Sequence, residues 1–250
     1  MTRVLAVANQ KGGVAKTTTV HSLGAALASA GRRVLLVDLD PQACLTFSLG
    51  VDAAGGSLHD VIVHQKPARE VLVKVGDLQL LPASIDLAGA EVYLLSKTGR
   101  EYALAQALEP IKSGYDVVLV DCPPSLGILT INGLTAADEV VIPLQCETLS
   151  GRGVGQLLET VDDVHKYTNP HLKVAGVVAT MYDSRTRLGQ QVLASMHDEY
   201  GLELLPPPIP KSVRVAEAPA ESLSVLEHAP RSPAADAYRA LAETIAARLP

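Results

Sequence analysis

Short apolar runs of strand length alternate with stretches of helical periodicity along almost the whole chain. The runs predicted to form strands are residues 3–9, 33–38, 78–82, 116–121, 139–144 and 173–181. Helical periodicity covers residues 16–30, 85–96, 102–112, 128–136, 153–167, 188–200 and 234–249. Because the strands are nearly continuous in Val, Ile and Leu, we expect both of their faces to be buried, as in parallel sheets. The pattern predicts a single α/β domain over residues 1–250, with a mostly parallel twisted sheet and helices on both faces.

The last predicted helix, 234–249, has one apolar face and one polar face. The apolar face carries Tyr238, Leu241, Ile245 and Leu249. The polar face is balanced in sign, with Asp236, Arg239, Glu243 and Arg248. A membrane anchor needs a basic polar face, so this helix is expected to dock on the core instead. The stretches 39–46, 181–187 and 206–228 are expected to be the loops with functional importance.

Composition narrows the class of protein. Hydrophobic residues make up 48% of the chain and charged residues 19%, with a net charge of −6, so a sizeable core is expected and overall disorder is excluded. A nucleic-acid partner would therefore need a local basic patch. The apolar runs are too short to cross a bilayer, and the first residues do not have the pattern of a signal peptide. Cys44, Cys122 and Cys146 lie far apart, which argues against a disulfide framework or a zinc site and favours the cytoplasm.

The strongest chemical signal follows the first strand, where residues 9–18 read NQKGGVAKTT. A strand, a Gly-rich turn and a Lys-Thr pair opening a helix form a cradle for a polyphosphate, because backbone N–H groups point at the anion. Lys16 adds a positive charge, and Thr17 is a candidate Mg²⁺ ligand. Gln10 and Ala15 stand where the GxxxxGK[ST] pattern has glycines. A positive φ at Ala15 would cost about 1 kcal/mol relative to Gly, and we expect a near-normal φ there.

This loop and four later segments together resemble the ParA/Soj-type ATPases, the deviant Walker A class that also contains MinD. The later segments are LVDLDPQ at 36–42, VLVDCPPS at 118–125, PLQCE at 143–147 and IPKSVRVAEAP at 209–219. Their joint order covers nearly the whole chain and is more specific than any one of them. The resemblance implies a P-loop NTPase-like fold, ATP and ADP as ligands, Mg²⁺ as cofactor, and ATP hydrolysis as the activity.

Individual roles follow from the matched positions. The cradle would be formed by Gly12, Gly13, Val14, Ala15, Lys16, Thr17 and Thr18. Asp121, at the end of an apolar strand, fits the residue that holds Mg²⁺ through water, together with Thr17. The family counterpart of Asp40 orients or deprotonates the attacking water. Asp38 lies nearby and Asp40 could instead cap a turn, so this assignment rests on the resemblance.

Two further parts of the nucleotide site are implied by the resemblance alone. Lys11 would reach across a dimer interface to the nucleotide of the partner, where a cation stabilises both the dimer and the transition-state charge. From the sequence alone, Lys11 could equally be a solvated lysine. Pro210 and Ser212, in the late loop, would contact the adenine. Ser212 stands where the family often has Asn.

The resemblance also implies nonspecific binding of double-stranded DNA by the ATP-bound homodimer. The matching cations are Arg185 and Arg214, with Arg187 and Lys211 as neighbours. Residues 151–214 nevertheless contain seven Lys or Arg and seven Asp or Glu. In addition, Ala220-Glu221-Ser222 follows the late loop where the family commonly has a Gly-Lys pair. An ion-paired surface without DNA contacts therefore stays open as an interpretation.

The sequence thus predicts a cytoplasmic, nucleoid-associated ATPase that partitions chromosome, plasmid or other cargo. A ParB-like protein is expected to stimulate its ATP hydrolysis, and no membrane binding is expected. A nucleotide-switched scaffold that binds a protein partner and little DNA is the first alternative. A kinase or amide-forming ligase using the same cradle is the second. A cluster-carrying role would rest on Cys122 and Cys146, which are more simply explained as small buried hydrophobic residues.

Overall fold

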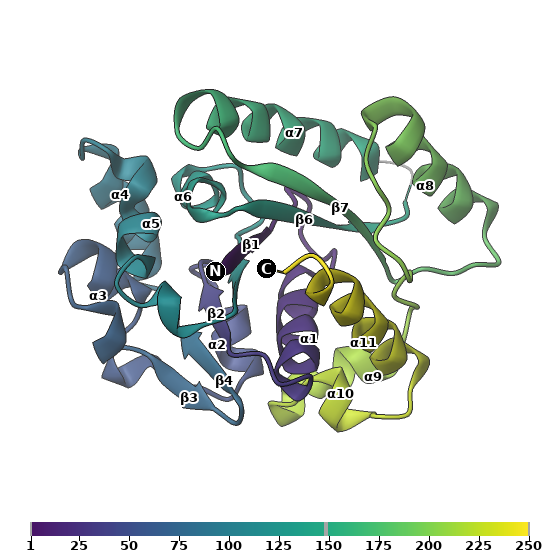
Figure 1. Cartoon of the computed structure of the whole chain (residues 1–250), viewed down its shortest axis with the longest axis horizontal. Coiled ribbons are helices and arrows are strands. Elements are labelled where there is room, and N and C mark those ends of the chain that lie inside the picture. The colour runs from purple at the N-terminus through teal and green to yellow at the C-terminus, as the bar shows by residue number, and fades with distance from the viewer. Residues whose placement is uncertain (1, 148–149, 250) are drawn as a thin grey trace.

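In the computed structural model, which describes residues 2–147 and 150–249, the strands form one seven-stranded sheet (Figure 1). The strands are β1 (Arg3–Val7), β2 (Val34–Asp38), β3 (Val73–Val75), β4 (Leu78–Leu81), β5 (Val117–Asp121), β6 (Glu139–Gln145) and β7 (Lys173–Thr180). Their order across the sheet is β3-β4-β2-β5-β1-β6-β7. The edge strand β3 runs antiparallel to β4, and the other neighbouring pairs are parallel. The predicted fold class is confirmed.

Helices cover both faces of this sheet, and each face has its own core. Leu5, Val7 and Leu36 point to one face, which packs against α1, α2, α10 and α11. Ala6 and Val37 point to the other face, which packs against the helices from α3 to α8. The helices are α1 (Lys16–Ser29), α2 (Cys44–Ser48), α3 (Leu58–Val63), α4 (Leu87–Leu95), α5 (Ala103–Leu108), α6 (Ile128–Ala136), α7 (Ser150–Tyr167), α8 (Arg187–Tyr200), α9 (Val213–Glu217), α10 (Val225–His228) and α11 (Pro233–Ala246).

The structure adds short elements that the periodicity did not predict. α2, α9 and α10 occupy parts of the predicted loops 39–46 and 206–228, and α3 and β3 lie in a stretch that had no assignment. Each has six residues or fewer, too few for a period to be visible. α3 and α10 begin with capping boxes, Ser57 with Asp60 and Ser224 with Glu227, which would have signalled their starts.

The terminal helix α11 packs on the core. Tyr238, Leu241 and Ile245 of α11 are buried beside α1, and the Tyr238 hydroxyl lies 3.4 Å from Thr19 Oγ1. α1 and α11 lie side by side in Figure 1. Within the described residues, no helix combines the length and apolar character needed to cross a bilayer.

The sheet topology brings several polar strand ends together. β1, β2 and β5 are adjacent and parallel, so their carboxyl ends meet at the same edge. Asp121 is the register partner of both Val7 and Asp38. The phosphate loop, which follows β1, therefore lies next to the acidic ends of β2 and β5.

Candidate functional site

The loop between β1 and α1 leads into a helix N-terminus whose N–H groups have no side-chain partner in the N-cap. The N-cap, Ala15, makes no side-chain cap, and the first turn of α1 has no acidic residue. The first N–H groups of a helix have no partner within the helix, and the helix dipole adds positive potential there. Lys16 is buried, and its Nζ donates to the carbonyl of Lys11 at 3.1 Å, across the loop. The geometry suits a bound polyanion.

The expectation of a near-normal φ at Ala15 was wrong. Ala15 has φ 64° and ψ 34°, in the left-handed region, and Gly13 has φ 75°. Both residues lie in the connection between β1 and α1, and Ala15 stands immediately before the helix. An alanine in this conformation is strained by about 1 kcal/mol relative to glycine.

Thr17 and Asp121 form the oxygen-rich end of the site. Thr17 Oγ1 donates to Asp121 Oδ2 at 2.7 Å, while Asp121 Oδ1 is buried without a hydrogen-bond partner. Burial, followed by the nearby Asp38 carboxylate, raises the pKa of Asp121 well above its usual range. Burial also lowers the pKa of Lys16, against the opposing effect of Asp121. Oxygen donors and an orphaned carboxylate oxygen fit a Mg²⁺ ion, which Thr17 and Asp121 would hold.

The structure gives Asp38 and Asp40 different surroundings. Asp38 is fully buried, and its Oδ2 accepts hydrogen bonds from the backbone N and Oγ1 of Thr46 at 2.8 and 2.7 Å. Burial raises the pKa of Asp38 to about 6. Asp40 lines the cavity beside Lys16, and its Oδ1 also accepts from the backbone N of Gln42 at 2.9 Å. Asp38 thus fastens the loop, and Asp40 both caps a turn and reaches the cavity.

One cavity of about 940 Å³ joins the phosphate loop to the late loop. Its lining includes most of the predicted nucleotide-binding residues, namely Gly12, Gly13, Ala15, Lys16, Thr17, Thr18, Pro210 and Ser212. The side chain of Val14 is buried beneath the loop. Lys211, predicted for the DNA surface, lines this cavity too. Pockets of 300–1,000 Å³ hold ligands of drug size, so the volume suits a nucleotide.

Lys11 lies beside the cradle and pairs with an acidic residue of its own chain. Its Nζ forms an ion pair with Glu147, and its backbone N donates to Asn9 Oδ1 at 3.0 Å. Asn9 Nδ2 in turn donates to the carbonyl of Pro143 at 2.7 Å, so the start of the loop is fixed to β6.

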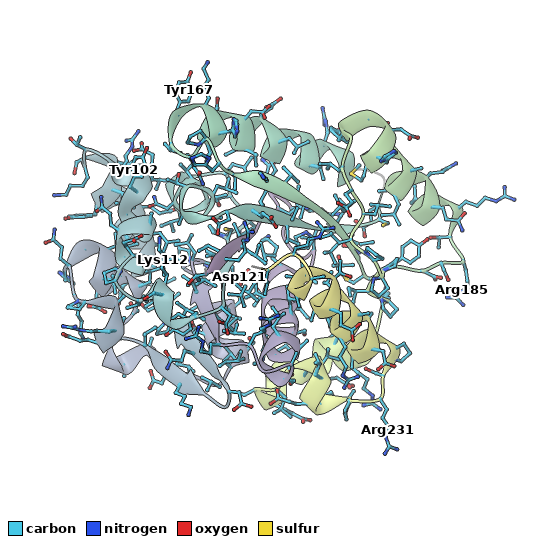
Figure 2. The ribbon with its side chains drawn as sticks, viewed as in Figure 1. Tyr102, Lys112, Asp121, Tyr167, Arg185 and Arg231 are labelled. Carbon is cyan, nitrogen blue, oxygen red and sulfur yellow. The ribbon has the colours of Figure 1, made fainter. Side chains whose placement is uncertain are left out.

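The predicted DNA-contacting residues lie in two segments that hydrogen bonds join to each other: Arg185 just before α8 with Arg187 at its start, and Lys211 and Arg214 in the late loop and α9. The backbone N of Tyr182 donates to Ile209 O at 2.9 Å, and that of Lys211 to Tyr182 O at 3.2 Å. Arg187 is the first residue of α8, and Figure 2 shows Arg185 at the outer edge of the molecule, far from Asp121 near its centre.

Two of these cations have intramolecular partners. Arg185 makes two side-chain hydrogen bonds to Asp183, at 2.9 and 2.8 Å, and Arg214 makes one to Glu217 at 3.0 Å. Glu221, in the segment that departs from the family pattern, has its Oε2 at 3.1 Å from His228 Nδ1. Surface pairs of this kind contribute little stability, and their carboxylates compete with any phosphate for the same cations.

Sequence reasoning missed three polar residues that hold the loops of the site. They are Asn9 and Thr46, described above, and Thr180, whose Oγ1 donates to Val14 O at 3.0 Å. All three are buried polar residues. Asn9 and Thr180 stand at or near the end of an apolar strand run, and that was the signal available for them, whereas Thr46 lies within the short helix α2.

The chain resembles known proteins over most of its length. A family model described as an AAA domain matches residues 2–174. The chromosome-partitioning ATPase Soj of Thermus thermophilus is 47% identical over 99% of this chain and 96% of its own length. The sporulation initiation inhibitor protein Soj of Bacillus subtilis is 45% identical over 99% of both chains. The chain belongs to the ParA/Soj family of ATPases.

A solved structure with the same fold carries a different name. It is a cobyrinic acid a,c-diamide synthase from Mycobacterium smegmatis with bound ADP and magnesium. It shares 54% identity with this ParA/Soj chain, with a TM-score of 0.88 over 98% of this chain and 94% of the other. The recognition of the family from the phosphate loop and the four later segments is confirmed.

Proposed function

We propose that this chain is an ATP-dependent dimerisation switch that binds nonspecific DNA and partitions chromosome, plasmid or other cargo. As a ParA/Soj family member, it is a Mg²⁺-dependent ATPase. The proposal adds three points to this activity. The chain forms a homodimer when ATP is bound, the dimer binds double-stranded DNA, and a ParB-like protein stimulates ATP hydrolysis. The proposal also places the protein in the cytoplasm, on the nucleoid.

The observation that carries the proposal is the shared cavity of the phosphate loop, Asp40 and the late loop. The N–H groups at the start of α1 bind the phosphates, and Lys16 neutralises charge on the β- and γ-phosphates. Thr17 and Asp121 hold Mg²⁺, which supplies further charge neutralisation. Asp40 orients the attacking water, and Pro210 and Ser212 contact the adenine.

Dimerisation gives Lys11 its proposed role. Lys11 is partly exposed and held by Glu147 in the single chain. In the ATP dimer it leaves Glu147 for the γ-phosphate bound to the partner subunit, because a triphosphate offers more negative charge than one carboxylate. The exchange makes dimerisation sensitive to whether the γ-phosphate is present.

The DNA surface is proposed to be Arg185, Arg187, Lys211 and Arg214 in these two joined segments. A dimer doubles these cations, which favours salt-sensitive phosphate contacts without base readout. The test is binding to random double-stranded DNA with ATP, ADP and no nucleotide, at about 50 and about 200 mM salt. Binding that needs ATP and falls steeply with salt supports the switch, whereas binding independent of nucleotide contradicts it.

A protein-binding scaffold is the second candidate, and the ion pairs of Arg185 with Asp183 and Arg214 with Glu217 favour it. If these pairs persist, the surface presents little net charge to DNA. The same titration decides between the two functions: ATP-driven dimerisation without DNA binding in any state supports the scaffold.

An amide-forming ligase is the third candidate, favoured only by the name of the Mycobacterium smegmatis structure. Such an enzyme must hold an acid acceptor beside the γ-phosphate, in a cavity of about 940 Å³ that a nucleotide also has to enter. Phosphate release that appears only with a carboxylic-acid acceptor and an ammonia source would support it. Release without any acceptor supports the ATPase.

A further inference from the structure

A single buried hydrogen bond joins the phosphate loop to the end of β7. Thr180 Oγ1 donates to the carbonyl oxygen of Val14 at 3.0 Å, and both residues are almost completely buried. The two residues are 166 positions apart in the sequence. Thr180 also lines the nucleotide cavity, beside Ala15 and Lys16.

Each partner of this bond precedes a left-handed residue that is not glycine. Ala15 follows Val14 with φ 64°, and Met181 follows Thr180 with φ 49°. Residues with a Cβ atom are disfavoured in this conformation and remain in it only where the surroundings enforce it. The φ angle of Ala15 is set by the position of the preceding carbonyl carbon, which belongs to Val14. A bond that fixes the Val14 carbonyl therefore restrains the φ angle of Ala15 directly.

We propose that Thr180 is a positioning residue that holds Ala15 in the left-handed conformation and so lets the phosphate loop work without a glycine at that position. The other side of Ala15 is fixed by the first bond of α1, from the backbone N of Thr19 to Ala15 O at 2.9 Å. With both peptide groups fixed, the N–H groups at the start of α1 stay directed at the cavity. The inference rests on the proposed nucleotide site.

The test is a double-substitution cycle between position 180 and position 15. ATP affinity is measured by calorimetry with Mg²⁺ for the parent chain, Thr180→Val, Thr180→Ser, Ala15→Gly and the double variant Thr180→Val/Ala15→Gly. Thr180→Val keeps the shape and removes the donor, so affinity should fall roughly tenfold, and Thr180→Ser should stay within about twofold. In the Ala15→Gly background the same Val substitution should cost only about twofold, because glycine adopts the left-handed conformation without help.

A matched control removes a comparable hydroxyl elsewhere. Thr135 is buried, and its Oγ1 lies 2.9 Å from Thr168 Oγ1, at the end of α6. Thr135→Val should leave ATP affinity unchanged. A parent-like affinity for Thr180→Val, an equal loss in the parent and Ala15→Gly backgrounds, or the same loss for Thr135→Val would each overturn the inference.

Urea unfolding without nucleotide gives an independent measurement. For ATP affinity the effect of Thr180→Val should be smaller in the Ala15→Gly background, whereas for the unfolding midpoint it should be larger. In the parent background, loss of the bond is partly offset because the loop relaxes from its strained conformation at Ala15. The midpoint should therefore fall more for Thr180→Val in the Ala15→Gly background than in the parent background. A parent chain that binds no ATP would reject the proposed function, while strictly additive effects on the midpoint would reject the role of Thr180.

Discussion

His21 Nδ1 lies 3.3 Å from the hydroxyl of Ser48, and both side chains are buried between α1 and α2. His21 is one turn beyond Thr17 and Thr18, which line the nucleotide cavity together with Ser48. The contact fixes α2, which carries the chain onward from Asp40, against the helix that follows the phosphate loop.

This buried imidazole predicts a loss of stability in acid. Burial lowers the pKa of His21 to about 4, against the smaller opposing effect of Glu227, compared with 6.5 for the ordinary side chain. Since the folded pKa is depressed, the neutral form stabilises the fold above pH 6.5, and that contribution is lost as the pH falls toward 4. Between pH 7.5 and 5, His21 should remove about 2 kcal/mol from the free energy of unfolding.

His21→Gln tests this dependence, because glutamine retains a polar group for Ser48 and does not titrate. The variant should lose about 2 kcal/mol less than the parent between the two pH values in urea unfolding. His171 is exposed, so His171→Gln serves as the matched control and should follow the parent. Parallel pH profiles for the parent and His21→Gln would contradict the assignment.

Lys16→Ala should abolish measurable ATP binding while the chain stays folded. The ammonium group is buried in the loop and donates to Lys11 O, so it is already placed where the phosphates would bind. Calorimetry with Mg·ATP measures the loss, which should exceed about 100-fold because charge-assisted contacts to phosphate are lost. Lys97→Ala, at an exposed lysine over the Tyr93 ring, is the control. Normal affinity in Lys16→Ala would reject the phosphate-loop assignment.

Asp40→Asn should retain ATP-dependent dimerisation and lose at least about 100-fold in turnover. Asparagine can still accept the hydrogen bond from Gln42 N, so the substitution preserves the turn and removes only the carboxylate. Asp52→Asn is the matched control, because Asp52 caps a similar turn by accepting from Ala54 N at 3.0 Å. Phosphate release at the parent rate in Asp40→Asn would leave Asp40 with its capping role alone.

Substitutions at Arg214 and Glu217 should shift DNA affinity in opposite directions. Arg214→Glu removes a phosphate contact and should weaken binding and reduce the salt slope by about 1, with monomeric nucleotide binding unchanged. Glu217→Gln frees Arg214 from its 3.0 Å partner and should strengthen binding. Both are measured on random duplex DNA with ATP. Equal DNA affinity for the two variants would show that Arg214 does not belong to the DNA-binding surface.

The order and type of the long elements could be predicted from the sequence. β1, β2, β5, β6 and β7 appeared as apolar runs because a strand covered on both faces needs hydrophobic side chains at nearly every position. The motif at 9–18 was readable because its residues are consecutive. β3 was missed although Gly76-Asp77 separates it from β4 by two residues, a recognisable hairpin signal.

How distant residues act on one another depends on the folded chain. Asp38 and Asp40 differ by two positions, yet only the fold turns Asp38 to Thr46 and leaves Asp40 at the cavity. The left-handed φ of Ala15 was predicted wrongly although the GxxxxGK[ST] pattern has a glycine at that position, and the bond from Thr180 Oγ1 to Val14 O beside it exists only in the folded chain. Periodicity reports which side chains are buried, whereas backbone conformation and polar pairing depend on contacts between segments far apart in sequence.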